Sequence, residues 1–429
     1  MTDHLEELQR EYLFPCVGTY YEQPLTLVGG QGMYVTDPEG VEYLDFFGGI
    51  LTISVGHCNE VVNEAVVEQN QTLQHTSTLY INEPQARLAQ KMAEITPGAL
   101  SKSFFTSSGT EANETAVLFA RLATGQSDII ALRHAYSGRS EVTLAITAHA
   151  PWRPMASSIP YIKHAHSPYC YRCSLGLTYP NCDLRCARDI EELIETTTCG
   201  QIAAFMAEPI QGVGGFITPP GEYFQVALEI VRKYGGLFIC DEVQTGCGRT
   251  GKTFCGIEHW GVQPDMVTFA KGLANGLPIG ATVATAAVAE SFTGLSIATF
   301  GGNPVSTRGA LATIDFIEDN RLAEKAEVLG GRLRDGLEAL KTKHPSIGDV
   351  RGMGLMQALE LVDPASADGK APDSQKVRQV FEETRRLGLL VGKGGLYGNV
   401  IRVTPPLIVS AAEIDHALEI LDKAFAAAR

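Results

Sequence analysis

The sequence predicts an α/β fold with a mainly parallel central sheet, because short apolar runs alternate with segments of helical periodicity. The clearest run, 237–240, is unbroken, as in strands that are buried on both faces of a parallel sheet. Two of the runs end in an acidic residue, Glu208 or Asp241, and a third leads into Lys271. Since ligands of such folds bind at the carboxyl ends of strands, we expect chemistry at this edge of the sheet.

The predicted elements alternate between strands and helices along the large domain. Leu88, Met92 and Ile95 recur at helical spacing, and the periodicity around Ala116 and Ala120 predicts a second helix. The other elements follow from short apolar runs and one more periodic segment. We expect strands at 103–105, 129–132, 202–207, 237–240 and 266–269, and a helix at 224–232.

The pattern changes at about residue 306, after which long helices and two short strands, 356–361 and 400–403, are predicted. The last helix begins with Ser410 and Glu413 at the spacing of a capping box. We interpret this part as a smaller α+β domain, to which the N-terminal segment packs. The predicted segments are 1–55, the N-terminal segment; 56–305, the large domain; and 306–429, the C-terminal domain.

Length and composition limit what the chain can do. Its 429 residues exceed the usual size of a single core, so we expect one large and one smaller domain. A formal charge of −15 argues against nucleic acid and anionic membranes as partners. We find no run of 18 uncharged apolar residues and, in the acidic start, no signal peptide. Together with ten cysteines, these features favour a reducing, cytoplasmic environment.

Asp241 and Lys271 follow two of the predicted strands, and together they indicate a cofactor. Neither is informative alone, because most lysines are solvated surface groups. A lysine that can form an imine and an aspartate that can hold a protonated ring nitrogen are the groups that pyridoxal 5'-phosphate (PLP) chemistry needs most. The pair therefore predicts PLP.

The segment TSSGTEAN, residues 106–113, lies between a predicted strand and a predicted helix. The backbone N–H groups of Gly109 and Thr110 would point outward at the positive end of that helix, where a phosphate binds well. The simpler alternative is an ordinary N-cap, which Ser and Thr supply in most helices. Beside Lys271 and Asp241, the segment favours a phosphate site.

These three motifs and five others occur in one order along nearly the whole chain, which resembles a class III aminotransferase of PLP fold type I. The alanine–glyoxylate and amine–pyruvate transaminases are the branch it resembles most. The resemblance implies a large domain with a mainly parallel sheet, a smaller α+β domain from both termini, and a homodimer or tetramer. The matching segments are TSSGTEANE, RHAYSGR, MAEPIQGVGG, CDEVQTGCGRTG, TFAKGLANG, TFGGNP, VRGMG and IRVTPPL.

The resemblance also implies roles for residues around the cofactor ring. Lys271 would hold PLP through an imine and, once displaced by substrate, carry the proton between Cα and C4′. Asp241 would pair with the ring nitrogen. Tyr136 would stack on one face of the ring and Val243 on the other, while Gln244 would reach the phenolic oxygen.

For the remaining contacts, the resemblance implies that Glu208 supports the Gln244 neighbourhood and that Arg402 binds the substrate carboxylate as a bidentate fork. Thr299 would reach the phosphate of the other subunit, which requires a homodimer with shared active sites. The phosphate would lie on Ser108, Gly109 and Thr110. Core packing, a turn cap or a structural ion pair are the alternatives for Tyr136, Val243, Thr299 and Arg402.

Three positions depart from relatives of the family. Val213 replaces a second glutamate that masks the arginine in the ornithine and γ-aminobutyrate branches, so Arg402 should stay available to carboxylates, or else swing out to admit an apolar amine. Leu51 falls where the amine-transaminase branch often has tryptophan, which would leave a roomier substrate pocket. Ser137 replaces the usual histidine, with an effect that the sequence leaves open.

Cys170, Cys173, Cys182 and Cys186 form a separate cluster of closely spaced thiols. Such spacing suits a zinc knuckle, a disulfide pair or four reduced thiols, and we predict no metal.

The sequence thus predicts a PLP-dependent transaminase with small-molecule substrates. The amino donor would be alanine, an ω-amino acid or a primary amine, and the acceptor pyruvate or glyoxylate, in a ping-pong mechanism. The alternative is an ammonia-releasing phospho-lyase on the same scaffold, for which Arg139 is the one candidate to bind a second phosphate.

Overall fold

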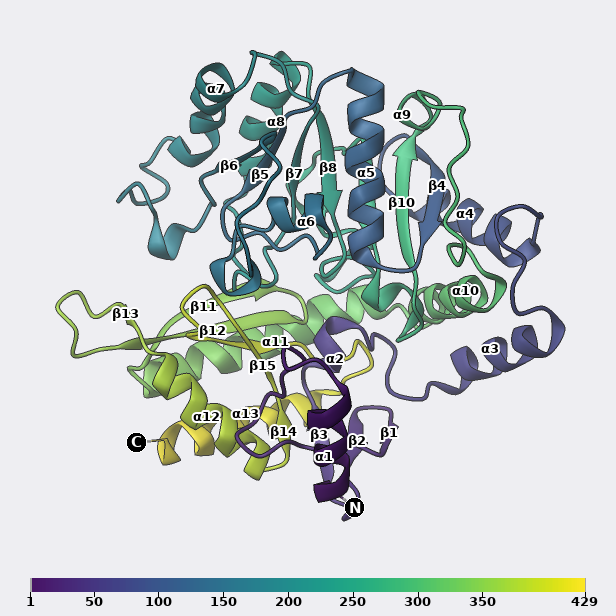
Figure 1. The fold of residues 1–429 in the computed structure, drawn as a ribbon. Coiled ribbons are helices and arrows are strands. Elements are labelled where there is room, and N and C mark those ends of the chain that lie inside the picture. The colour runs from purple at the N-terminus through teal and green to yellow at the C-terminus, as the bar shows by residue number, and fades with distance from the viewer. Residues whose placement is uncertain (1, 429) are drawn as a thin grey trace.

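A computed structural model describes residues 2–428, which form three β-sheets and the helices around them. Figure 1 shows an upper part built on one wide sheet and a lower part that contains both chain ends. No helix in this range is long and apolar enough to cross a membrane.

The wide sheet has seven strands in the order β4-β10-β9-β8-β7-β5-β6. Only β10 runs antiparallel to its neighbours, which confirms the predicted α/β class and the mainly parallel sheet. All five predicted strands are present, whereas β6 and β10 were not predicted. The strands are β4 (Leu100–Thr106), β5 (Ile129–Leu132), β6 (Ile162–Ala165), β7 (Ala204–Ala207), β8 (Leu237–Asp241), β9 (Met266–Phe269) and β10 (Gly280–Thr285).

The wide sheet is buried on both faces, as its apolar strands predict. In β5, Ile129 and Ala131 pack in one hydrophobic cluster, whereas Ile130 and Leu132 belong to the larger core. Successive side chains of a strand point to opposite faces, so helices must cover both. Helix α5 (Gly109–Thr124) covers one face and crosses in front of the sheet in Figure 1.

The lower part contains two smaller sheets, of order β1-β2-β3-β14 and β11-β12-β16-β15, with β13 paired to β12. Because β14 pairs in parallel with β3, strands from the two ends of the chain share one sheet. Strands β12 and β16 confirm two predictions, whereas the other strands of these two sheets were not predicted. The boundaries at 55 and 305 stay predictions. The strands are β1 (Gly29–Gln31), β2 (Tyr34–Thr36), β3 (Glu42–Asp45), β11 (Ile347–Met353), β12 (Met356–Asp363), β13 (Ala371–Pro372), β14 (Leu389–Leu390), β15 (Gly392–Gly394) and β16 (Val400–Val403).

The helices include those predicted from periodicity, and the last one begins with the predicted capping box between Ser410 and Glu413. The α-helices besides α5 are α1 (Thr2–Tyr12), α2 (Gly48–Leu51), α3 (Glu60–Thr72), α4 (Glu83–Ile95), α6 (Glu141–Ile146), α7 (Arg185–Thr197), α8 (Tyr223–Lys233), α9 (Ala286–Ala289), α10 (Pro304–Asp319), α11 (Leu322–Lys343), α12 (Ser374–Arg386) and α13 (Ala411–Ala427). Short 3₁₀ helices are η1 (Ala150–Trp152), η2 (Cys170–Arg172), η3 (Gly256–Trp260) and η4 (Lys271–Ala274).

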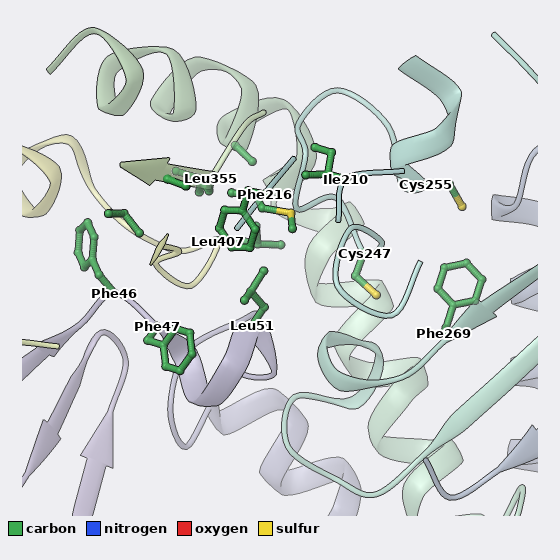
Figure 2. Packing of buried hydrophobic residues seen from close by; sticks show 14 of the residues in the cluster. Phe46, Phe47, Leu51, Ile210, Phe216, Cys247, Cys255, Phe269, Leu355 and Leu407 are labelled. Atoms are coloured by element: carbon green, nitrogen blue, oxygen red, sulfur yellow. The ribbon is translucent and has the colours of Figure 1, made fainter. Parts of the chain in front are cut away.

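A continuous apolar core joins the N-terminal segment, the large sheet and the C-terminal part. Figure 2 shows Phe46, Phe47 and Leu51 in one buried cluster with Phe216 and Leu407. These residues come from three distant stretches of the chain, so burial of their side chains holds the stretches together. The polar side chains described next lie on elements that this core fixes.

Candidate active site

A cavity of about 630 Å³ opens beyond the carboxyl ends of β7, β8 and β9. It is where the sequence predicts chemistry, because ligands of parallel sheets bind at this edge. Ten of the twelve predicted site residues line it, although they come from distant parts of the chain. They are Ser108, Gly109, Thr110, Tyr136, Glu208, Asp241, Val243, Gln244, Lys271 and Arg402.

Asp241 is the last residue of β8, and its buried carboxylate is held in one orientation. Asn113 Nδ2, from α5, donates to Oδ2 at 2.8 Å, and the Val243 backbone N donates to Oδ1 at 3.1 Å. Thr268 Oγ1 donates to Asn113 Oδ1 at 2.7 Å, which fixes the direction of the amide. Burial raises the pKa of Asp241, while Asn113, Val243 and Lys271 act to lower it. A nearby cation would therefore stabilise the charged form of this carboxylate.

Lys271 follows β9 and begins η4, with its side chain on the same cavity. Burial lowers the pKa of its amine to about 8, against the opposing effects of Asp241 and Glu208. A neutral amine is the nucleophilic form, so near neutral pH a usable fraction of Lys271 can attack an aldehyde.

The N-terminus of α5 opens on the cavity through Ser108, Gly109 and Thr110. Ser108 is also the N-cap of this helix, since its Oγ accepts from the Glu111 backbone N at 3.2 Å. The cap and an anion site therefore coexist. A Cβ on Gly109 would lie 3.1 Å from Val243, and one on Gly138 would lie 2.6 Å from Thr110 Oγ1. This cradle of unblocked backbone at a positive helix end fits a phosphate.

Glu208 links two loops of the cavity, one containing Tyr136 and the other Gly212. Its carboxylate accepts from the backbone N of Tyr136 at 3.1 Å and of Gly212 at 2.7 Å, and burial raises its pKa to about 8, with Asp241 acting in the same direction. A Cβ on Gly212 would lie 2.4 Å from the Gln244 amide. The Gln244 amide oxygen is buried and has no partner in residues 2–428, so it is available to a ligand.

Arg402 lies on β16 and is only 4% exposed, yet its Nε and Nη1 atoms have no hydrogen-bond partner within the described chain. Its guanidinium carbon lies 5.0 Å from the centre of the Phe47 ring and 5.7 Å from that of Phe216. Val213 lines the cavity as well. Within residues 2–428 these two Arg402 nitrogens have no carboxylate partner, so they are open to an anion.

Two predicted site residues lie elsewhere. Leu51 is buried in the core of Figure 2, whereas its neighbour Ile50 lines the cavity. The four residues of α2 have positive φ angles, from 56° at Gly48 to 68° at Ile50, and this left-handed turn decides which side chain faces inward. Thr299 is exposed and does not line this cavity.

Ser137 and several residues without a predicted role complete the lining. The Ser137 backbone N donates to Thr147 Oγ1 at 3.0 Å, and its carbonyl accepts from Asn113, so its main chain links the loop to the Asp241 network. The Tyr136 ring meets the Trp152 ring edge-on, with 5.7 Å between centres. Other residues also line the cavity, although the sequence predicts no role for them: Tyr20, Asn113, His149, Trp152 and Gly394.

The four clustered cysteines lie away from this cavity and are free thiols. Burial raises the pKa of the Cys186 thiol to about 12. Among residues 2–428 no three His, Cys, Asp or Glu side chains are arranged to hold a metal ion.

The lining fits PLP. The helix end can take the phosphate, Asp241 a protonated ring nitrogen, and the neutral Lys271 amine the aldehyde. We therefore expect PLP to bond to the cofactor-free protein faster as pH rises, by about tenfold per unit below pH 8, with a plateau above it. Stopped-flow absorbance of the imine measures this rate. Asp241 raises the pKa of Lys271, so Asp241→Asn should move the midpoint to lower pH; an unmoved midpoint would contradict this account.

Comparison with known proteins agrees with the geometry. The profile of the family "Aminotransferase class-III" matches residues 19–425. The mitochondrial alanine–glyoxylate aminotransferase 2 homolog 2 of Arabidopsis thaliana is 42% identical over 96% of this chain and 85% of its own. A thermostable (S)-enantioselective omega-transaminase from Thermomicrobium roseum superposes with a TM-score of 0.90, at 35% identity, over 99% of this chain and 98% of its own.

A phospholyase from Arthrobacter, solved with phosphoethanolamine, has the same TM-score of 0.90, at 29% identity, over 98% of this chain and 99% of its own. The fold is thus shared by proteins with different reactions, and the family follows from the match over nearly the whole chain. This chain belongs to the class-III aminotransferases, the PLP-dependent enzymes of fold type I.

Proposed function

We propose that this enzyme moves an amino group from alanine, an ω-amino acid or a primary amine to pyruvate or glyoxylate, in a ping-pong mechanism. The observation that carries the proposal is the buried guanidinium of Arg402, which faces the cavity without a carboxylate partner in residues 2–428. A carboxylate on the donor and one on the acceptor can use this cation in turn.

Arg402 also limits the charge that an acceptor can carry. Lys393 lines the same cavity, but its Nζ donates to the Tyr20 carbonyl at 2.9 Å and lies 4.4 Å from the centre of the Phe381 ring. A dicarboxylate such as 2-oxoglutarate would therefore bring a second negative charge to a pocket in which, within residues 2–428, Lys393 is already engaged and Arg402 is needed for the first carboxylate. Because an unpaired buried charge is costly, small monocarboxylate acceptors are favoured.

The bound cofactor supplies an electron sink for the electrons released at the substrate Cα. Lys271, with its amine pKa lowered to about 8 by burial, is the base that would take the Cα proton and return it to the cofactor side. Asp241, oriented by Asn113 and Val243, would keep the ring nitrogen protonated. Because the site is buried, water is excluded from these charged groups, and the electrostatic interactions between them are stronger than in water.

We expect 2-oxoglutarate to be the poorest of three acceptors, with a kcat/KM roughly 10²-fold below that of pyruvate or glyoxylate. Steady-state rates with a common amine donor measure this order. Val213→Glu should place a carboxylate beside Arg402 and lower kcat/KM for pyruvate. Val213→Gln adds a side chain of the same shape as glutamate but without the charge, so it should lower kcat/KM less. A wild-type preference for 2-oxoglutarate would refute the assignment.

The competing function is an ammonia-releasing phospho-lyase, which would need a second phosphate site. Arg139 is exposed and does not line the cavity, so the support for this alternative is weak. Amine without any keto acid separates the two reactions. A transaminase stops after one equivalent, whereas a lyase continues to release ammonia.

The proposal includes a homodimer in which Thr299 reaches the partner's phosphate. Thr299 lies in the exposed stretch 293–300, which carries several large apolar side chains. Exposure of such side chains to water is unfavourable. Ile81 is 98% exposed and Leu295 is 96% exposed, values typical of side chains that a second chain covers. Other exposed apolar residues of these two segments are Leu79, Tyr80, Ile297 and Phe300.

Mixed dimers test the shared site. Lys271→Ala and Thr299→Glu subunits should each be inactive or weak alone, because the first lacks the amine and the second repels phosphate. Co-expressed, they should regain activity, since each mixed dimer has one site with Lys271 from one subunit and Thr299 from the other. Thr293→Glu, on the same exposed stretch, is the control and should be active alone. Absence of regained activity in purified mixed dimers would overturn the shared site.

A further inference from the structure

His149 is a buried side chain on the cavity that the proposed reaction leaves unused. It lies between α6 and η1, is 2% exposed, and lines the same cavity as Arg402. Neither its Nδ1 nor its Nε2 has a hydrogen-bond partner within residues 2–428. Buried polar groups are nearly always paired, because an unpaired one costs about 1–3 kcal/mol.

The other unpaired atoms of the cavity are already explained. Arg402 is open to the substrate carboxylate, and the Gln244 amide faces the expected cofactor. His149 is neither part of the helix end that fits the phosphate nor of the Asp241 network. Its partner should therefore come from the part of the substrate that is not the carboxylate.

The charge state of His149 limits the chemistry of that partner. Burial lowers the pKa of His149 to about 4, and His134 and Arg402 act in the same direction. The imidazole is thus neutral, with one ring nitrogen that donates and one that accepts. A charged carboxylate or ammonium group would be buried beside a neutral ring that offers no counter-charge, and an alkyl group makes no hydrogen bond. A hydroxyl group is uncharged and can pair with whichever ring nitrogen faces it, as a donor or as an acceptor.

We propose that His149 is a specificity-determining residue that hydrogen-bonds a substrate hydroxyl, so that hydroxylated amino and keto acids are preferred over their deoxy analogues. This inference rests on the proposed transaminase function, with the carboxylate on Arg402. Apolar pockets discriminate weakly against a hydroxyl, but a site built to bond one discriminates strongly against its loss. We expect a preference of about tenfold or more in kcat/KM.

The test compares matched amino donors in the half-reaction with the holoenzyme alone, followed by the absorbance of the cofactor. Serine is compared with alanine, and homoserine with 2-aminobutyrate, so that two chain lengths are covered. Wild type should prefer the hydroxylated donor in at least one pair by about tenfold. His149→Phe, which keeps the ring shape, should bring that ratio near one, whereas His149→Gln, which keeps a donor and an acceptor, should retain much of it.

The outcomes separate this inference from the function on which it rests. If no donor converts the cofactor, both are overturned. If alanine reacts but wild type shows no hydroxyl preference in either pair, only the role of His149 is overturned, and its ring nitrogens are satisfied by water instead. A preference that persists in His149→Phe would also overturn it. The wild-type ratios decide the matter even where a variant fails to fold.

Discussion

Lys271→Ala should lower kcat by about 10⁴-fold or more and remove the yellow imine absorbance of the purified enzyme. The substitution deletes both the covalent attachment and the cavity amine whose pKa burial lowers to about 8. Lys393, the other lysine of the lining, donates to the Tyr20 carbonyl and is not free to replace it. Spectra and single-turnover rates of the variant measure both effects.

A matched control separates loss of this amine from loss of any lysine. Lys325→Ala removes an exposed lysine of α11 that does not line the cavity, and it should keep the absorbance and the rate of wild type. Borohydride reduction of wild type should fix the cofactor on a peptide that contains Lys271. Attachment at another lysine, or an active Lys271→Ala enzyme, would overturn the assignment of the site.

The fold was predictable where strands are apolar and buried, and not where small or charged residues form them. Strands β5 and β8 are unbroken apolar runs and were predicted closely. Strand β10 (GATVAT) is built of small residues and begins against the segment that contains Ser108. A Cβ on Gly280 would lie 2.2 Å from the Ser108 carbonyl oxygen. Strand β11 carries Asp349 and Arg351 and shows no apolar alternation.

The site was predictable where a motif fixes local backbone, and not where distant segments meet. Asn113 stands in the recognised segment 106–113, yet its role comes from a bond to Asp241, 128 residues away. His149 carries no motif, and only the folded chain shows that both its nitrogens are buried and unpaired. Ile50, and not the predicted Leu51, lines the cavity because of the left-handed turn of α2, a backbone conformation that β-branched residues rarely adopt.

Asp241→Asn should cost about 3–5 kcal/mol of transition-state stabilisation, which is roughly a 10²- to 10⁴-fold fall in kcat/KM. The side chain keeps its size but loses the charge that pairs with a protonated ring nitrogen. Its new NH2 group would also face a donor, either Asn113 Nδ2 or the Val243 backbone N, because both oxygens of Asp241 accept a hydrogen bond. Steady-state kinetics with alanine and pyruvate, together with the cofactor dissociation constant, measure the loss.

Glu242 provides the control for Asp241, because it is the next residue and is also buried but does not line the cavity. Burial raises the pKa of Glu242 to about 7, and its carboxylate accepts from the Ile257 backbone N at 2.8 Å. Its Oε2 accepts from the Thr245 hydroxyl. A glutamine can keep both contacts, because its amide oxygen accepts from Ile257 N and its NH2 group can donate to the Thr245 hydroxyl oxygen, so Glu242→Gln should keep the turnover of wild type. If both variants lost activity equally, loss of buried charge in general would explain the effect. A large loss in Asp241→Asn alone would assign it to the carboxylate that faces the cofactor ring.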